Sequence, residues 1–117
     1  MYLGYNLNAS SYSIKPYVEF VIRKIREMPI IIYVEGSREK IEELCIKEWG
    51  LPAQIFALET WLMDKGQALV GNKYVADIGF DINKDATGGG AVLSAESMAI
   101  MGKIGMDIYF SEYPSAE

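Results

Sequence analysis

The aspartates in the last third of the chain are the residues whose type and spacing could do chemistry. Oxygen-bearing side chains alternate there at Asp81, Asn83, Asp85 and Thr87. Calcium-binding loops use this spacing because alternate side chains then turn onto one hard cation. The remaining signature is missing, since Ala86 stands where such a loop needs glycine and Val92 where it needs a bidentate glutamate. We therefore expect turn chemistry at this loop, no metal ion and no cofactor.

Three consecutive glycines, Gly88 to Gly90, follow this loop. Successive backbone amides could hold an anion at the start of the next helix. The segment lacks the lysine of a phosphate loop and the strand-glycine-helix order of a dinucleotide fingerprint. Asp81 and Asp85 would also repel a phosphate. We interpret the glycines as a flexible or tightly turning connection, and anion binding stays open.

The acidic residues that flank this loop form the candidate site. Asp77 and Asp81 share one face of a predicted strand about 13 Å apart, at about 3.3 Å per residue, too far to share a proton. Asp107, on a neighbouring predicted strand, is expected between them. Like charges on one sheet face destabilise the fold unless water or a partner meets them. The face is either ordinary wet surface or a partner-binding site, whose candidate residues are Asp77, Asp81, Asp85, Asp107 and Glu112.

The chain has no histidine and only one cysteine, Cys45. Nucleophiles relayed through imidazole, two-histidine metal sites and histidine pH switches are therefore excluded. An internal disulfide and a cysteine-built zinc site are excluded as well. Catalysis would have to use carboxylates, Lys, Tyr or Cys, and we predict no catalytic residue.

Charge is distributed unevenly along the chain. The net charge is −5, and residues 67–117 hold three basic against seven acidic side chains. Such a surface repels phosphate backbones, so nucleic acid is a poor partner and a basic protein or a metal ion is a better one. Eight tyrosines add rigid, amphipathic contact area of the kind that protein interfaces use. A homodimer is left open.

Size and patterning predict one domain over residues 1–117, with a flexible tail at residues 114–117. The longest apolar run, residues 29–34, has only the length of a strand, so no membrane span is expected. The N-terminus shows no basic region followed by an apolar run. We therefore expect a cytoplasmic protein.

Hydrophobic periodicity predicts the elements that must position these residues. Proline and glycine set several boundaries: Pro16 starts a helix that Pro29 ends, and Gly50, Gly66 and Gly105 each terminate one. Ser37 and Ser94 are plausible N-caps. The expected strands cover residues 3–7, 30–34, 67–70, 73–82 and 106–111, and the expected helices residues 16–28, 37–50, 53–65 and 95–104.

This order predicts an α+β or α/β fold, with a mixed sheet of four to five strands and three to four helices packed on it. Gly71-Asn72 is read as a hairpin turn into the strand at 73–82. Met98, Met101 and Ile104, with Ile108 and Phe110, are expected to cover the buried face of that strand. Tyr109 should point to the opposite face.

Residues 92 to 110 run from Val92-Leu93-Ser94-Ala95-Glu96 to Ile104-Gly105-Met106-Asp107-Ile108-Tyr109-Phe110. This segment resembles the closing helix and strand of several small bacterial domains and immunity proteins of toxin systems. The resemblance implies a neutraliser of a cationic toxin, typically a nuclease, whose basic active site is covered by carboxylates standing in for phosphates. It carries over no particular functional residue.

The sequence therefore favours an acidic protein-binding domain, of the immunity or inhibitor kind, with a basic protein partner. Two other classes remain as alternatives. One is a small-molecule or metal sensor centred on residues 81–90. The other is an enzyme that uses carboxylate, lysine or tyrosine chemistry in a cleft with shifted pKa values.

Overall fold

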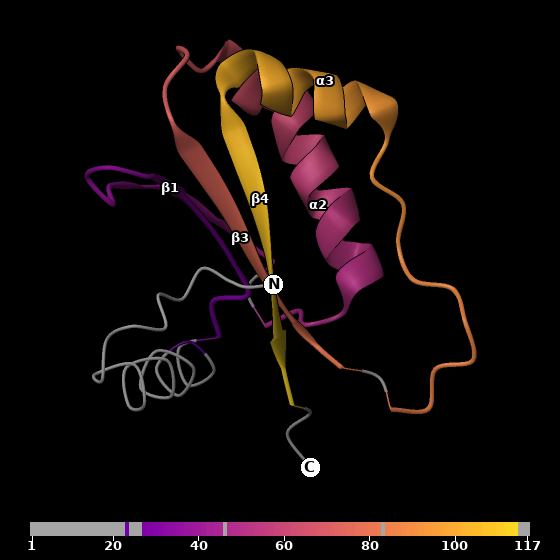
Figure 1. Cartoon of the computed structure of the whole chain (residues 1–117). Coiled ribbons are helices and arrows are strands. Elements are labelled where there is room, and N and C mark those ends of the chain that lie inside the picture. The colour runs from indigo at the N-terminus through magenta and orange to yellow at the C-terminus, as the bar shows by residue number, and fades with distance from the viewer. Residues whose placement is uncertain (1–22, 24–26, 46, 83, 115–117) are drawn as a thin grey trace, which may run out of the picture.

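The computed structural model describes residues 23, 27–45, 47–82 and 84–114 (Figure 1). The predicted strand at 3–7 lies outside the described residues, and so do residues 115–117. Of the predicted helix at 16–28, only residues 23, 27 and 28 are described. In chain order the described elements are β1 (Ile30–Val34), β2 (Lys40–Leu44), α2 (Leu51–Asp64), the 3-10 turn η2 (Gly66–Ala68), β3 (Tyr74–Asp81), α3 (Ala95–Ile104) and β4 (Met106–Tyr113).

The described strands form one mixed sheet of order β2-β1-β3-β4. β1 pairs antiparallel with both β2 and β3, and β3 pairs parallel with β4. The expected α+β class and mixed sheet are confirmed. The described residues hold two α-helices and four strands, against the three to four helices and up to five strands expected.

The predicted helix at 37–50 is wrong, because residues 40–44 form β2. A turn at residues 35–37 reverses the chain after β1, and the Val34 amide hydrogen bonds to the Glu39 carbonyl at 2.8 Å. Ile41 and Leu44 pack on the core as partly buried residues. Pairing with β1 overrides the helical spacing of these apolar residues, because a short segment gains more from tertiary contacts than from its own propensity.

The predicted strand at 67–70 and the hairpin turn at Gly71-Asn72 are also wrong. Both edges of β3 are occupied by β1 and β4, so no edge remains for an adjacent hairpin partner. Residues 66–68 instead form the 3-10 turn, and Val70 is 82% exposed. Gly71-Asn72 has the residue types of a hairpin turn, but β3 pairs with β1 and β4, which are distant in sequence, and not with residues 67–70.

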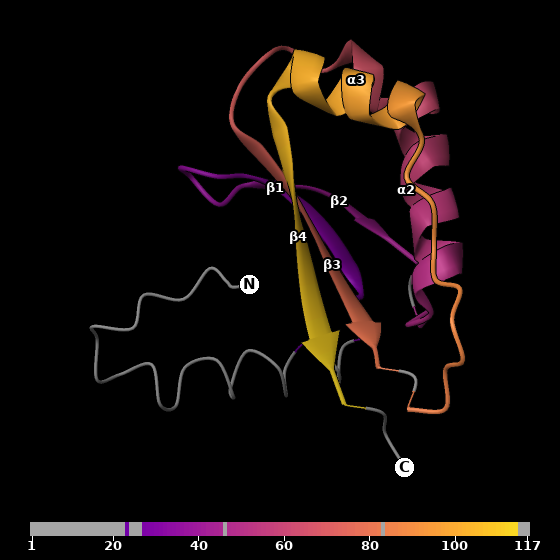
Figure 2. The same ribbon diagram turned by 45° about the vertical axis from the view of Figure 1, so that its right-hand side comes forward.

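The core lies between the sheet and the two helices, which cover the same face (Figures 1 and 2). Ile30 and Ile32 of β1 and Ala76 and Ile78 of β3 are fully buried there. Complete burial of each isoleucine side chain contributes roughly 1.5–3 kcal/mol to the stability of the folded state. The helical residues packed against them are Ile55, Leu58, Trp61 and Leu62 of α2, with Met101 and Ile104 of α3. None of the described helices is long and apolar enough to cross a bilayer.

α3 begins and ends where the sequence predicted. The Ser94 hydroxyl accepts a hydrogen bond from the Ser97 amide, and Gly105 ends the helix with a left-handed φ of 85°. A carboxylate of α2 supports this start, since Glu59 Oε2 accepts from the Ser94 amide at 2.7 Å and from Ser97 Oγ at 2.9 Å. The chain then enters β4 directly at Met106, so the position of α3 determines where β4 begins.

The outer strand is less covered than expected. Phe110 has the face predicted for it, beside Phe80, with ring centroids 6.4 Å apart, but its side chain is 42% exposed. Met98 is 51% exposed, whereas Met101 and Ile104 are buried as predicted. Among the described strands β4 lies at the edge of the sheet, whereas α2 packs on β2 and β3, so side chains of β4 stay partly exposed.

We expect opposite effects from two glycine substitutions near the end of α3. A Cβ at Gly105 would lie 2.1 Å from the Asn72 carbonyl oxygen in addition to the positive φ, whereas a Cβ at Gly102 meets nothing within 4 Å. Gly105→Ala should lower the free energy of unfolding by more than about 1–2 kcal/mol. Gly102→Ala, inside the helix, should raise it by roughly 0.5–1 kcal/mol. Urea unfolding measures both, and equal stabilities would contradict this helix end.

A second prediction concerns how the contribution of Glu59 to stability depends on pH. Hydrogen bonds from the Ser94 amide, then from the Ser94 and Ser97 hydroxyls, hold its pKa below the ordinary value of 4.5. A lowered folded-state pKa contributes stability that is present above the unfolded pKa and lost as pH falls through the folded one. Glu59→Gln should therefore be less stable than the parent at pH 7, with the gap closing below about pH 4.5.

The control for Glu59 is Glu39→Gln. Glu39 is exposed, and its carboxylate makes no hydrogen bond or ion pair with the rest of the described chain. Its unfolding curve should follow the parent's from pH 7 to pH 3. A gap between parent and Glu59→Gln that stays constant over this range would contradict the carboxylate's role.

Candidate functional site

The strand register places the predicted acidic residues in three different environments. Asp77 and Asp81 share the face of β3 away from the helices, and Asp107 lies on that face of β4. Asp107 pairs with Val75, so it lies before Asp77 along the sheet and not between Asp77 and Asp81 as expected. Glu112 pairs with Phe80 and points to the helix side. The structure does not gather these residues on one face.

Asp77 is engaged inside the protein. Its Oδ1 lies 3.1 Å from Nη1 of Arg23 and accepts a hydrogen bond from Ser111 Oγ at 2.9 Å. Its side chain is 21% exposed, and that of Arg23 is 9% exposed. The charge of Asp77 is therefore compensated at short range, in surroundings that screen the pair weakly.

Arg23 connects three segments of the chain through its guanidinium group. Nε donates to the Met28 carbonyl at 2.9 Å and Nη2 to the Pro29 carbonyl at 2.6 Å, both just before β1. Nη2 also donates to the Asp77 carbonyl of β3 at 2.8 Å, and Nη1 to the Tyr113 hydroxyl of β4 at 3.1 Å. The guanidinium lies 5.5 Å from the centre of the Tyr113 ring, within reach of a cation–π contact.

Gly79 makes room for this contact from the side of β3. A Cβ there would lie 2.5 Å from the Tyr113 ring and 3.0 Å from the Arg23 guanidinium carbon. The Gly79 amide donates to the Pro29 carbonyl at 2.7 Å, and its carbonyl accepts from Gln54 Nε2 of α2 at 2.7 Å. The polar network on one face of β3 is thus joined to α2 on the other.

Sequence reasoning did not find Arg23. In the chain it is one of several charged residues on a predicted helix, and its partner Asp77 is 54 positions away. No local signal reports a contact of that separation. Gly79, inside the predicted strand at 73–82, was the available hint, because a strand glycine often marks the close approach of another group.

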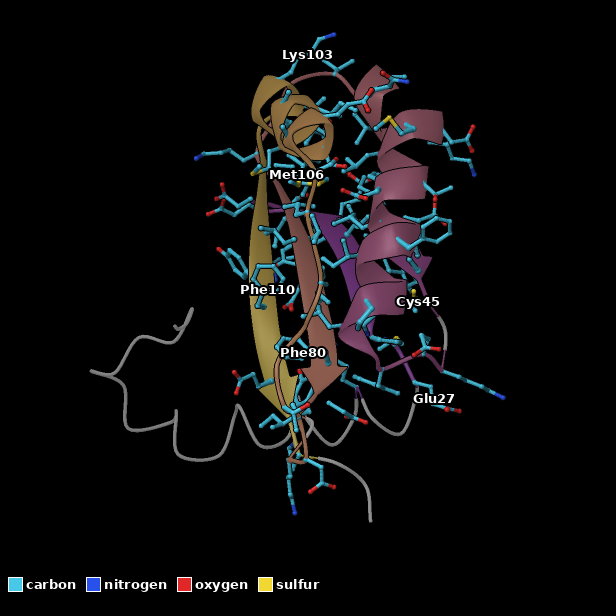
Figure 3. The ribbon with its side chains drawn as sticks, turned by 90° about the vertical axis from the view of Figure 1, so that its right-hand side faces the viewer. Glu27, Cys45, Phe80, Lys103, Met106 and Phe110 are labelled. Atoms are coloured by element: carbon cyan, nitrogen blue, oxygen red, sulfur yellow. The ribbon has the colours of Figure 1, made fainter. Side chains whose placement is uncertain are left out.

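Asp107 and Glu112 are the exposed carboxylates of β4. Neither makes a hydrogen bond or an ion pair with its side chain to any described residue. They lie five positions apart, hence about 16 Å at about 3.3 Å per residue, on opposite faces of the strand. Tyr109 and Phe110 stand between them in the strand, 36% and 42% exposed. Figure 3 shows the Phe110 side chain on β4.

Asp81 and Asp85 lie near the carboxyl end of β3. Asp81 is half-buried, and its amide donates to the Trp49 carbonyl at 3.0 Å, whereas Asp85 is exposed in the following loop. Gly88, Gly89 and Gly90 all have positive φ, as a turning connection requires. The described residues contain no cluster of three side chains suited to a metal ion.

Among the described residues, two titratable groups other than carboxylates have raised pKa values. Burial, and then the charge of Asp77, raises the pKa of Tyr33, so its hydroxyl stays protonated at neutral pH. Burial likewise raises the pKa of the Cys45 thiol, the direction opposite to that of an activated nucleophile.

Comparison with models of protein families, with curated proteins and with solved structures finds no match to this chain. The function must therefore be argued from the geometry of the chain itself.

The Arg23–Asp77 pair should be energetically coupled. Removal of one partner leaves the other charge poorly solvated, so Arg23→Met and Asp77→Asn should each cost about 3 kcal/mol of stability. The double variant should cost less than the sum of the two, by about 0.5–3 kcal/mol. Denaturant unfolding of the four proteins gives this coupling. Asp107→Asn is the control, expected within about 0.5 kcal/mol of the parent, and strict additivity would contradict the pair.

Proposed function

We propose that this protein is an acidic protein-binding domain, of the inhibitor or immunity kind, that neutralises a basic protein. The observation that carries the proposal is the composition of the outer strand. β4 presents Asp107 and Glu112 without a described counter-charge, beside exposed Tyr109 and Phe110, at the edge of the sheet.

Charge distribution supports a basic partner. The strand contains two acidic residues and no lysine or arginine, within a chain of net charge −5. Complementary charges raise association rates and reject wrongly charged partners more than they raise affinity. Nucleic acid carries the same sign of charge as this edge and would be repelled.

The exposed aromatic residues of β4 would supply most of the binding affinity. Exposed carboxylates at an interface rim contribute modestly to affinity, whereas buried aromatic side chains at its centre contribute most. Tyr109 and Phe110 stand at the middle of β4 with Asp107 and Glu112 on either side. This order, apolar at the centre and charged at the rim, is that of a protein interface.

The internal ion pair refines the set of binding residues. Asp77 is held by Arg23 and Ser111, so its charge contributes mainly to the fold. Asp81 and Glu112 come near the carboxyl ends of neighbouring parallel strands, and Asp85 follows in the loop. The proposed surface therefore consists of the β4 edge, with Asp81 and Asp85 at one end.

The proposal is tested with two variants of equal net charge. Asp107→Lys with Glu112→Lys reverses the β4 carboxylates, and Glu39→Lys with Asp64→Lys reverses two exposed carboxylates elsewhere. Proteins retained by the parent chain from extracts of its source cells are identified and purified, and association rates are measured against salt concentration. The β4 variant should associate at least about tenfold more slowly at low salt than the control.

A retained partner of acidic pI would contradict the proposal. Equal slowing by both variants would show that total charge matters and that the β4 edge does not.

A further inference from the structure

We infer that β4 accepts an extended segment of the basic partner as a fifth strand, and that this segment carries two basic residues five positions apart with two apolar residues midway between them. The inference rests on the proposed function and specifies which partner sequence its surface would recognise. It follows from the register, the exposure and the charges of β4.

Within the described part of the chain, β4 is a long strand with no further strand on its outer side. The strand has eight residues, and β3 is its only strand partner among the residues described. Natural edge strands are protected against pairing by charged side chains, lysine above all, and by proline, bulges or shortness. The charges of β4, Asp107 and Glu112, are acidic, so they disfavour pairing with an acidic strand but not with a basic one. β4 contains neither lysine nor proline, and its pairing with β3 is in continuous register from Met106 to Tyr113. A peptide can therefore add to this edge through main-chain hydrogen bonds.

The spacing of the partner's charges follows from that register. Side chains on adjacent strands pair one to one and on the same face. Asp107 points away from the helices and Glu112 toward them, five positions later. Basic residues that meet both must therefore also be five positions apart, on opposite faces of the added strand. This holds whether the segment runs parallel or antiparallel to β4.

The middle of the segment is specified by the exposed rings. The positions opposite Tyr109 and Phe110 lie on the two faces of the new strand, and apolar or aromatic side chains there would cover both rings. Phe110 already contacts Phe80 on its inner side, so a cross-strand neighbour would extend an existing aromatic cluster. The pattern expected is basic, any, apolar, apolar, any, basic.

A second copy of the chain does not fit this edge. Two β4 strands side by side would bring four carboxylates, two from Asp107 and two from Glu112, onto one ribbon with no basic residue on either strand. Like charges at such separations disfavour the pairing. Charge complementarity therefore selects a basic segment of another protein over self-association.

The experiment titrates the isotopically labelled full chain with synthetic peptides at low salt, followed by NMR. The matched peptide is acetyl-Thr-Lys-Thr-Val-Tyr-Thr-Lys-Thr-amide. The shifted control, acetyl-Thr-Lys-Thr-Val-Tyr-Lys-Thr-Thr-amide, has the same composition but lysines four apart, hence on one face. Two further matched peptides carry backbone N-methyl groups, each on one of the two alternating sets of amides.

The matched peptide should bind at least tenfold more tightly than the shifted one, with chemical-shift changes centred on the β4 amides. Neutralising Asp107→Asn and Glu112→Gln together should remove that preference. One N-methylated peptide should lose binding and the other retain it, because only alternate amides of an added strand face β4.

Each other outcome separates the two proposals. Equal binding of both peptides, still dependent on Asp107 and Glu112, would overturn the strand register and leave the acidic binding surface intact. No binding of any peptide, while the Asp107→Lys, Glu112→Lys protein still loses its partner, would likewise overturn the added strand alone. If that reversed protein keeps its partner, the proposed function itself fails.

Discussion

The fold depends on the burial of one guanidinium group against the second face of the sheet. A charged side chain taken from water is strongly destabilising unless a counter-charge and hydrogen bonds surround it. Arg23 meets this requirement with Asp77, three main-chain carbonyls and the Tyr113 hydroxyl. These groups come from the segment before β1, from β3 and from the end of β4. The pair therefore determines how three strands and the residues preceding them fit together.

This constraint also explains which carboxylates of the sheet remain without a nearby counter-charge among the described residues. Within a sheet face, a compensated charge is part of the fold and an uncompensated one is part of the surface. Asp77 belongs to the first kind, and Asp107, diagonal to it on β4, to the second. The helices add a further distinction, because α2 packs on β2 and β3 and leaves Phe110 of β4 partly exposed. Charge and apolar area consequently coincide at one edge.

Local sequence was sufficient wherever an element is defined by its own caps and period. Ser94 and Gly105 mark the two ends of α3, the spacing of Ile55, Leu58 and Leu62 marks the buried side of α2, and alternation marks β3. It failed at residues 40–44, where Ile41 and Leu44 are three apart in a strand as they would be in a helix. Local sequence failed again at Gly71-Asn72, where two residues typical of a hairpin turn do not connect two paired strands. In both places the outcome depends on which distant strand is available for pairing.

For the candidate site, what the sequence determined and what only the tertiary structure decided can be separated clearly. Composition alone determined that this protein is acidic, lacks histidine and has no cysteine pair, and hence which chemistries it cannot perform. Residue types also identified Asp107 as a surface carboxylate on a strand, and Glu112 as a surface carboxylate just after the predicted end of that strand at residue 111. Only the tertiary structure decided that Asp77 forms an ion pair with Arg23, that Glu112 points to the helix side of the sheet, and that Phe110 is partly exposed. The physical reason is that charge compensation and burial depend on neighbours far away in the sequence, such as Arg23 and Asp77, 54 positions apart.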